Sequence, residues 1–147
     1  PKTEFVGKSA KYILDKIGIT VGDDVKVILM EAKEDHPFVQ VELMMPILPL
    51  VRVPDVDQAI EMAVRVEHGN RHTAMMHSRN VEKLTKMAKL IQTTIFVKNG
   101  PSYAGIGVGG EGYTTFTIAG PTGEGLTSAK SFARRRRCVL VGGMDVR

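Results

Sequence analysis

A glycine-rich stretch, residues 95–125, constrains the fold of this chain more than any other feature. Nine of the 26 residues from Gly100 to Gly125 are glycine, and two more are proline. Glycine inside a helix or strand costs about 0.5–1 kcal/mol per residue, so this density is unfavourable unless the backbone turns tightly or approaches another group closely. A strand is predicted within the stretch at Tyr113–Ile118. Two interpretations stay open: backbone that lines a ligand site, or a set of tight turns.

Within this stretch, residues 105–110 read Gly-Ile-Gly-Val-Gly-Gly and satisfy the three-glycine pattern of dinucleotide-binding folds. That pattern holds a pyrophosphate only where it follows a strand and opens a helix. Here Glu111, Gly112 and a β-type run follow, and no helix begins. We therefore reject a Rossmann phosphate loop.

Length and composition predict a single globular domain, or part of one, because the chain has 147 residues of which 43% are hydrophobic. No apolar run approaches the roughly 18–20 residues of a membrane helix, and no apolar signal segment is present, so we expect no membrane contact. A single cysteine, Cys138, favours a reducing, cytoplasmic setting. Since the chain begins with Pro1, we expect a processed or partial product.

The net charge of +4 comes from one local cluster, Arg134–Arg137. Without these four residues the 20 basic side chains would fall to 16, equal to the 16 acidic ones. Nucleic-acid-binding proteins usually spread Lys and Arg over a groove-sized surface. We therefore expect no nucleic-acid partner, and a basic binder resting on the arginine run is the least favoured hypothesis.

The order of predicted elements indicates an α/β fold, because strands alternate with helices as they do in parallel crossover units. Asp55 is a predicted helix N-cap, with Gln58 at the reciprocal capping-box position. Three helices are predicted, at Ser9–Ile17, from Asp55 to near Gly69 and at Asn80–Ile91, the last with Val81, Leu84, Met87, Ala88 and Ile91 facing inward. The predicted strands before the glycine-rich stretch are Val25–Met30, Val39–Val41, Ile47–Val53, His72–His77 and Thr94–Val97.

The last part of the chain differs in pattern. Ser128–Val141 has no helical period, and it ends in an apolar run that starts at Cys138. Such a segment is predicted to extend away from the main body as a strand and to pair with another subunit. We therefore divide the chain into a main part, residues 1–126, and an extended oligomerisation tail, residues 127–147.

Among polar side chains, Glu42 is flanked by apolar residues on a bent strand, where its carboxylate could accept hydrogen bonds from a ribose diol. The alternative is an ordinary outward-facing strand residue. His68, His72 and His77 lie close in sequence, but no thiolate or acidic residue repeats their spacing, so a metal site is not expected. A histidine beside a glycine turn is better suited to proton handling or hydrogen bonding. Cys138 is interpreted as structural because no histidine or helix N-terminus adjoins it.

Four segments together resemble one family. They are VELMMPILP, VEHGNRHTAMMHSRN, the glycine-rich stretch and TSAKSFARRRRCVLV. In collinear order, and over essentially the whole chain, they are similar to the C-terminal part of CoA-acylating aldehyde dehydrogenases of the aldehyde dehydrogenase superfamily. The nearest branch comes from ethanolamine and propanediol utilisation, whose enzymes work inside bacterial microcompartments.

The resemblance implies a mostly parallel catalytic-domain sheet and a two-step reaction with NAD and coenzyme A. A cysteine thiolate attacks a short-chain aldehyde, hydride passes to the nicotinamide, and the CoA thiol then releases the acyl group from its thioester. Glu42 matches the glutamate of a Glu-x-Phe-Gly-Pro motif that holds the nicotinamide-side ribose. Met44 stands where that motif has its aromatic residue, and it would supply softer apolar packing.

Three further roles come from the resemblance. His72 matches an active-site histidine in a Gly-His-Thr-Ser segment of aldehyde–alcohol dehydrogenases. Asn99 and the turn Gly120-Pro121-Thr122 fall where the family lines the aldehyde and acyl pocket. The tail resembles the strand that crosses to a neighbouring subunit, which implies a homo-oligomer and possible shell or cargo contacts in a microcompartment.

The family is about three times as long as this chain, and its Rossmann-type domain and nucleophilic cysteine would lie upstream of Pro1. We therefore expect the chain alone to be inactive. Two alternatives remain: a non-catalytic docking or oligomerisation module, and a hydrolytic NAD-dependent aldehyde dehydrogenase, whose water-activating residue would also lie elsewhere. The sequence does not distinguish NAD from NADP or fix the aldehyde chain length.

Overall fold

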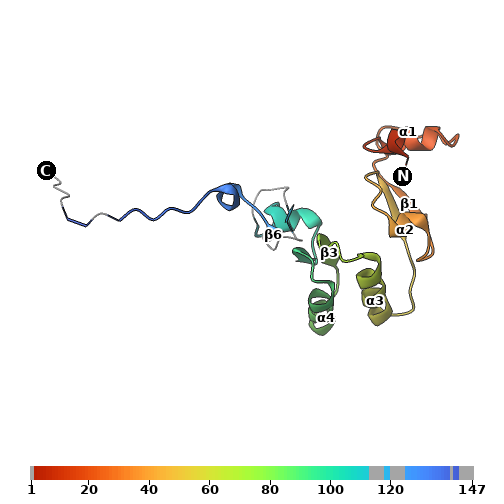
Figure 1. The fold of residues 1–147 in the computed structure, drawn as a ribbon. Coiled ribbons are helices and arrows are strands. Elements are labelled where there is room, and N and C mark those ends of the chain that lie inside the picture. Colours follow the sequence, from red (N-terminus) through yellow and green to blue (C-terminus); the bar gives the residue numbers. More distant parts are fainter. Residues whose placement is uncertain (1, 113–117, 120–124, 140, 143–147) are drawn as a thin grey trace. The chain divides into compact units, whose positions relative to one another are not determined.

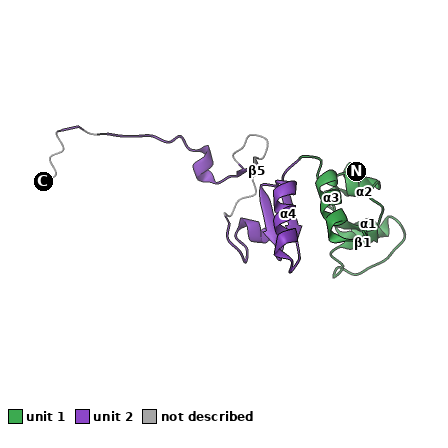
Figure 2. Ribbon diagram, turned by 90° about the horizontal axis from the view of Figure 1, so that it is seen from below, with its two compact units in different colours: residues 1–69 green, residues 70–147 purple. Residues whose placement is uncertain are grey.

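The computed structural model describes residues 2–112, 118–119, 125–139 and 141–142. Its contacts divide the chain into two compact units, residues 1–69 and residues 70–147 (Figure 2). The boundary falls within the 1–126 segment that the sequence predicted as the main part.

The first unit is built on a parallel pair of strands, β1 (Ile28–Glu31) and β2 (Ile47–Leu50), with Ile28 opposite Ile47. Parallel strands need a crossover connection, which residues 32–46 provide. Both strands alternate between half-buried and exposed residues, and three of the four outward side chains are apolar: Leu29, Leu48 and Leu50 are 64%, 55% and 44% exposed, and the fourth is Glu31. The remaining elements of this unit are η1 (Thr3–Phe5), α1 (Ala10–Asp15), α2 (Pro37–Gln40) and α3 (Val56–Val66).

Local capping signals explain where the longer helices of this unit begin. The side chain of Ser9 accepts a hydrogen bond from the Tyr12 N–H, and that of Asp55 accepts one from the Gln58 N–H at 2.9 Å. The predicted N-cap at Asp55 is confirmed. Gln58 reaches back to the Asp55 carboxylate at 3.1 Å, whereas a capping box would place that contact on the Asp55 backbone. The helix α3 then buries Ile60 almost completely.

One strand prediction in this unit is wrong. Residues 39 and 40 belong to the short helix α2, and Val41 follows it as an extended residue. Pro37 stands in the first turn of α2, where its fixed φ suits a helix and its missing N–H costs nothing. His36 completes the helix start, because its Nδ1 accepts the Phe38 N–H at 3.1 Å.

An ion pair fastens α3 to the loop after β1. Arg65 donates from Nε to Glu34 Oε1 at 2.8 Å and from Nη2 to Oε2 at 3.1 Å. Hydrogen bonding from Arg65 lowers the pKa of the Glu34 carboxyl, and Glu34 in turn raises the pKa of Arg65. The two-point geometry fixes orientation, and solvent screening limits its energy because both side chains reach water.

The second unit repeats the parallel arrangement (Figure 1). The strand β3 (Thr73–Met76) pairs with β4 (Ile95–Lys98), and α4 (Val81–Ile91) lies in the connection between them. Two parallel strand pairs confirm the predicted α/β class. Asn80 caps α4 by accepting the Lys83 N–H at 3.0 Å, and the buried residues of the helix are Leu84, Met87 and Ile91. Val81 was predicted to face inward but is 70% exposed, because it occupies the first helical position.

In the glycine-rich stretch, the residues that follow β4 pack on one another and on β4. The first element after β4 is the 3-10 helix η2 (Ser102–Ile106), and a Cβ on Gly105 would overlap the Ile95 side chain. A Cβ on Gly110 would lie 2.9 Å from the Ala104 carbonyl oxygen. In this part of the stretch, glycine is therefore needed for close approach between segments of the chain itself. Ile95, Val97 and Ile106 form the buried cluster that results.

The predicted strand Tyr113–Ile118 lies outside the described residues except at Ile118. Ile118 and Ala119 form β5, which pairs antiparallel with β6 (Gly125–Leu126). Ile118 and Leu126 both pack against the buried cluster. The antiparallel pair therefore adds a second layer of contacts beside β4.

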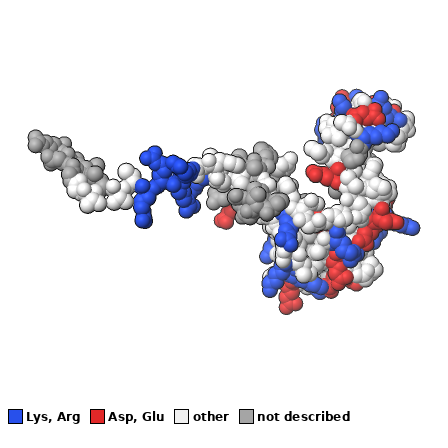
Figure 3. Space-filling view, in the orientation of Figure 1, with Lys and Arg blue, Asp and Glu red and all other residues white. Residues whose placement is uncertain are grey.

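The sequence predicted an extended tail, but part of the tail is helical. Residues Ala129–Phe132 form a 3-10 helix, η3, because the side chains of Ser128 and Ser131 make a reciprocal capping box. Residues 133–139 form neither helix nor strand and are exposed, including the arginine run, which Figure 3 shows as a basic stretch. Pairing of the tail with another subunit stays a prediction. Among the described residues, no helix is long and apolar enough to cross a membrane.

Candidate functional site

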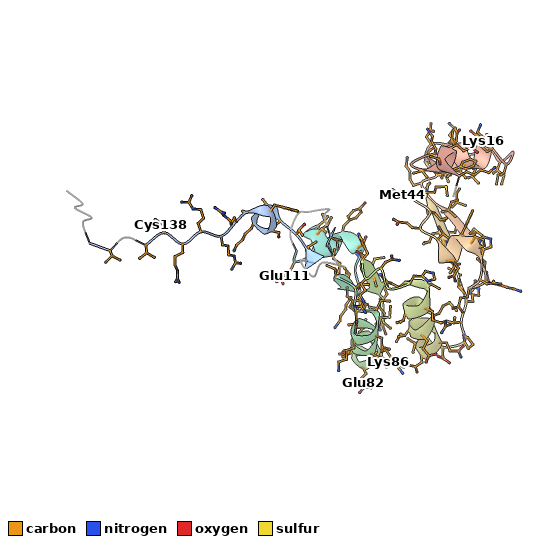
Figure 4. The ribbon with its side chains drawn as sticks, in the orientation of Figure 1. Lys16, Met44, Glu82, Lys86, Glu111 and Cys138 are labelled. Carbon is orange, nitrogen blue, oxygen red and sulfur yellow. The ribbon has the colours of Figure 1, made fainter. Side chains whose placement is uncertain are left out.

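Glu42 and Met44 lie on the loop between α2 and β2. Leu43, which stands between them, is 8% exposed and anchors the loop, while Glu42 is exposed and Met44 is 67% exposed (Figure 4). Met44 has a left-handed backbone (φ 50°), and its carbonyl oxygen accepts the Gly7 N–H at 3.0 Å. The loop thus presents a carboxylate and an apolar thioether to solvent two residues apart. A carboxylate can accept hydrogen bonds from a pair of hydroxyl groups, and a thioether can pack against an apolar surface.

A groove of about 670 Å³ adjoins this loop, and Met44 is one of its walls. Lys8, Lys11 and Lys26 line it together with Asp23. Lys11 contacts Asp23 Oδ1 at 3.1 Å, and Lys26 donates to the Asp23 carbonyl oxygen at 2.5 Å, so Asp23 orders two of the three ammonium groups. The sequence analysis missed these lysines because they come from two separate segments that only the fold brings together.

His72 directly precedes β3 and is held at two points. Its carbonyl oxygen accepts the Ile95 N–H at 3.1 Å, which extends the β3–β4 pairing, and its Nδ1 lies 2.7 Å from Thr73 Oγ1. The exposed imidazole stands at a hollow of about 130 Å³. The other lining residues of the hollow are Thr73, Ile95, Ser102, Tyr103, Ile106 and Ile118.

Asn99 follows β4 with a left-handed backbone (φ 56°), and its side chain contacts the chain after β3. Its Oδ1 accepts the Ser78 N–H at 2.7 Å, and its Nδ2 donates to the Ser78 carbonyl oxygen at 2.9 Å. The Asn99 N–H also bonds to the Met76 carbonyl oxygen at 3.0 Å. Asn99 therefore clamps the carboxyl ends of β3 and β4, a structural role that the sequence analysis did not anticipate.

Within the second unit, the structure places His72 and Asn99 apart from each other. The register of β3 and β4 pairs Thr73 with Ile95 and Met76 with Lys98, so His72 and Asn99 stand at opposite ends of the strand pair. At about 3.3 Å per residue, five steps along the strand separate them by about 16 Å. Glu42 and Met44 belong to the other unit, and Gly120, Pro121 and Thr122 lie outside the described residues. Their roles stay predictions.

The histidines that follow α3 and flank β3 are spread along the chain. His72 and His77 flank β3 at its two ends, and His68 lies before the turn at Gly69. In the described part of the chain, no three His, Cys, Asp or Glu side chains are grouped so that they could hold a metal ion. Cys138 is a free thiol, and it is exposed on the tail (Figure 4).

Residues 26–124 match the model of the aldehyde dehydrogenase family, and they make up most of the chain. The chain belongs to this family. The match confirms the superfamily to which the four sequence segments pointed, and it includes both the Glu42 loop and most of the glycine-rich stretch.

Individual relatives show which members of the family are similar to this chain. A propanal dehydrogenase (CoA-propanoylating) from Citrobacter freundii is 56% identical over 98% of this chain. The structure of propionaldehyde dehydrogenase from Rhodopseudomonas palustris, with bound CoA and an acylated cysteine, is 74% identical over 95% of the chain, with a TM-score of 0.89.

A propionaldehyde dehydrogenase from the fucose utilisation bacterial microcompartment of Clostridium phytofermentans is 56% identical over 92% of the chain, with a TM-score of 0.85. This chain spans only about a third of each of the three relatives: 32%, 32% and 31% of their lengths. The CoA-acylating branch that the sequence indicated is thus the branch to which these relatives belong.

Proposed function

We propose that this chain is the C-terminal third of a CoA-acylating aldehyde dehydrogenase. The complete enzyme would convert a short-chain aldehyde, CoA and NAD⁺ into acyl-CoA, NADH and a proton. The observation that carries this proposal is the 56% identity to a CoA-propanoylating propanal dehydrogenase over 98% of the chain. Identity at this level, spread over both units, supports a shared reaction and not only a shared fold.

In this proposal the loop after α2 holds the nicotinamide cofactor, which accepts hydride from the substrate when bound. The exposed carboxylate of Glu42 accepts hydrogen bonds from the ribose hydroxyls, and Met44 packs against the apolar face of the cofactor. Two features of the structure support these roles. Leu43 fixes the loop by burial, and the Gly7–Met44 hydrogen bond fixes its backbone, so both side chains point outward without a rearrangement.

In the same proposal, the second unit would bind the aldehyde. His72, oriented by its contact with Thr73, would donate a hydrogen bond or move a proton at the substrate oxygen. Asn99 would act through its clamp on Ser78, which positions the loop after β3. We extend the pocket to Gly120, Pro121 and Thr122, which follow the strand that carries Ile118. The nucleophilic cysteine would lie outside this chain.

A direct test is to express the whole reading frame that encodes this chain and to measure NADH formed from propanal with and without CoA. CoA-dependent NADH and propanoyl-CoA would support the proposal. Equal NADH without CoA would indicate a hydrolytic enzyme, and the absence of both NADH from NAD⁺ and NADPH from NADP⁺ would favour the docking-module alternative.

The role of Glu42 can be tested in the same protein. Glu42→Ala should raise the KM for NAD⁺ and slow hydride transfer while the melting temperature stays unchanged. Glu4→Ala is a matched control, because Glu4 is another exposed glutamate in the same unit. Unchanged KM and turnover in Glu42→Ala would remove the ribose role.

We also propose that residues 1–126 belong to the catalytic domain and that residues 127–147 serve oligomerisation. The exposed apolar side chains of Phe132, Val139 and Val141 (74%, 68% and 91% exposed) support an unfilled contact surface on the tail. The Clostridium relative supports a microcompartment location, in which shell or cargo proteins would be further partners. Cofractionation of the tagged full-length enzyme with shell particles would test that location.

A further inference from the structure

We infer that the hollow beside His72 receives the carbon chain of the aldehyde, and that Ile106 sets its depth. The inference rests on the proposed function and adds to it a residue that selects substrate length. The glycine-rich stretch would then contribute to substrate specificity, because Ile106 is the last residue of η2 and lies within that stretch.

The lining of the hollow divides into an apolar part and a polar part. Ile95, Ile106 and Ile118 come from three separate elements and form the apolar part. His72, Thr73 and Ser102 form the polar part, with His72 Nδ1 and Thr73 Oγ1 only 2.7 Å apart. An aldehyde has the same division, with a polar carbonyl at one end and an apolar chain at the other. The hollow is therefore complementary to this class of substrate.

The size of the hollow limits the chain that it can receive. Its volume is about 130 Å³. A water molecule in the liquid occupies about 30 Å³, so the hollow holds the equivalent of about four small groups. Pockets for drug-sized ligands are larger, about 300–1,000 Å³. A chain of a few carbons fits, and a long aliphatic chain does not.

The part of the lining formed by Ile95 and Ile106 cannot easily move away from the hollow. Ile95 and Ile106 are 6% and 9% exposed and belong to one buried cluster with Val97. Gly105, next to Ile106, lies so close to Ile95 that a Cβ would overlap it. Because η2 already touches β4, the hollow can be deepened only by shortening a side chain. Ile106 is the suitable position, since the helix η2 carries it in direct contact with the strand that also bonds His72.

The test compares kcat/KM for unbranched aldehydes from acetaldehyde to octanal, with CoA and NAD⁺, in the full-length enzyme. Ile106→Ala should shift the preferred chain to longer aldehydes. The ratio of kcat/KM for hexanal to that for propanal should rise by about fourfold for each additional CH₂ that becomes buried. Ile106→Val, which removes one methyl group, should give a smaller shift in the same direction and serves if the alanine variant does not fold.

Ile91→Ala is the matched control, because Ile91 is 4% exposed on α4 and does not line the hollow. It should lower stability and leave the hexanal-to-propanal ratio unchanged. If Ile106→Ala and Ile106→Val keep the wild-type ratio while the enzyme remains active, the pocket assignment is wrong and the proposed function stands. If the wild-type protein shows no CoA-dependent aldehyde oxidation, the proposed function fails and the pocket inference fails with it.

Discussion

Substituting Gly105 with alanine tests how tightly the glycine-rich stretch packs on β4. The new Cβ would lie less than 3.0 Å from Ile95 Cγ2, whereas carbon atoms in contact prefer about 3.5–4.0 Å. Ile95 is 6% exposed and packs against Val97 and Ile106 in one buried cluster, so space for it to move exists only toward the hollow that it lines. Overpacking of this kind typically costs about 1–3 kcal/mol. We therefore expect Gly105→Ala to destabilise the second unit by that amount.

The assay is thermal unfolding of the full-length protein, followed by circular dichroism. For a domain of 150–250 residues, a loss of 1 kcal/mol lowers Tm by about 2–4 °C, so the expected decrease is about 2–12 °C. Gly22→Ala is the control, because its Cβ would be equally close to Asp24 Oδ1. Asp24 is exposed and can rotate away, so the change should stay within about 0.5 kcal/mol.

Neither glycine has a left-handed backbone, so strain from φ does not enter the comparison. A Tm for Gly105→Ala equal to that of Gly22→Ala would refute the packing argument. The double variant Gly105→Ala with Ile95→Ala should lose less stability than the sum of the two single losses, because the shortened side chain at position 95 makes room for the new Cβ.

Three further predictions concern the helices and the tail. Asn80→Ala should cost about 1 kcal/mol by removing the cap on the Lys83 N–H, Asn80→Asp should retain most of it, and an equal loss in both would contradict the capping role. Arg65 lowers the pKa of Glu34, so their pairing stabilises the fold above the unfolded carboxyl pKa and is lost as pH falls through the lowered value. The stability advantage of the wild type over Arg65→Met should therefore shrink as the pH falls below 4.5, the ordinary pKa of a glutamate carboxyl, and a constant difference would argue against it. Deleting residues 128–147 should dissociate the oligomer in light scattering, whereas an intact oligomer would exclude the tail as its contact.

Sequence signals predicted most of the elements because these signals act over a few residues. Asp55 and Asn80 cap helices through hydrogen bonds to backbone three residues away, and both helices were predicted at the right place. The strand predicted at Val39–Val41 was wrong because proline is an ambiguous local signal. A proline at the first turn of a helix and a proline that interrupts a strand look alike in sequence, and the His36 side chain decided between them.

Site residues were harder to predict, because their roles depend on partners far along the chain. The sequence by itself determined the α/β class, the N-cap at Asp55 and the family, since these depend on local pattern and on motifs read in order. Only the tertiary structure placed His72 and Asn99 at opposite ends of one strand pair and bonded Asn99 to Ser78. The tertiary structure also showed why position 105 requires glycine: a larger side chain there would overlap Ile95. Strand register and side-chain contact join residues that no local pattern connects, so the fold alone could decide them.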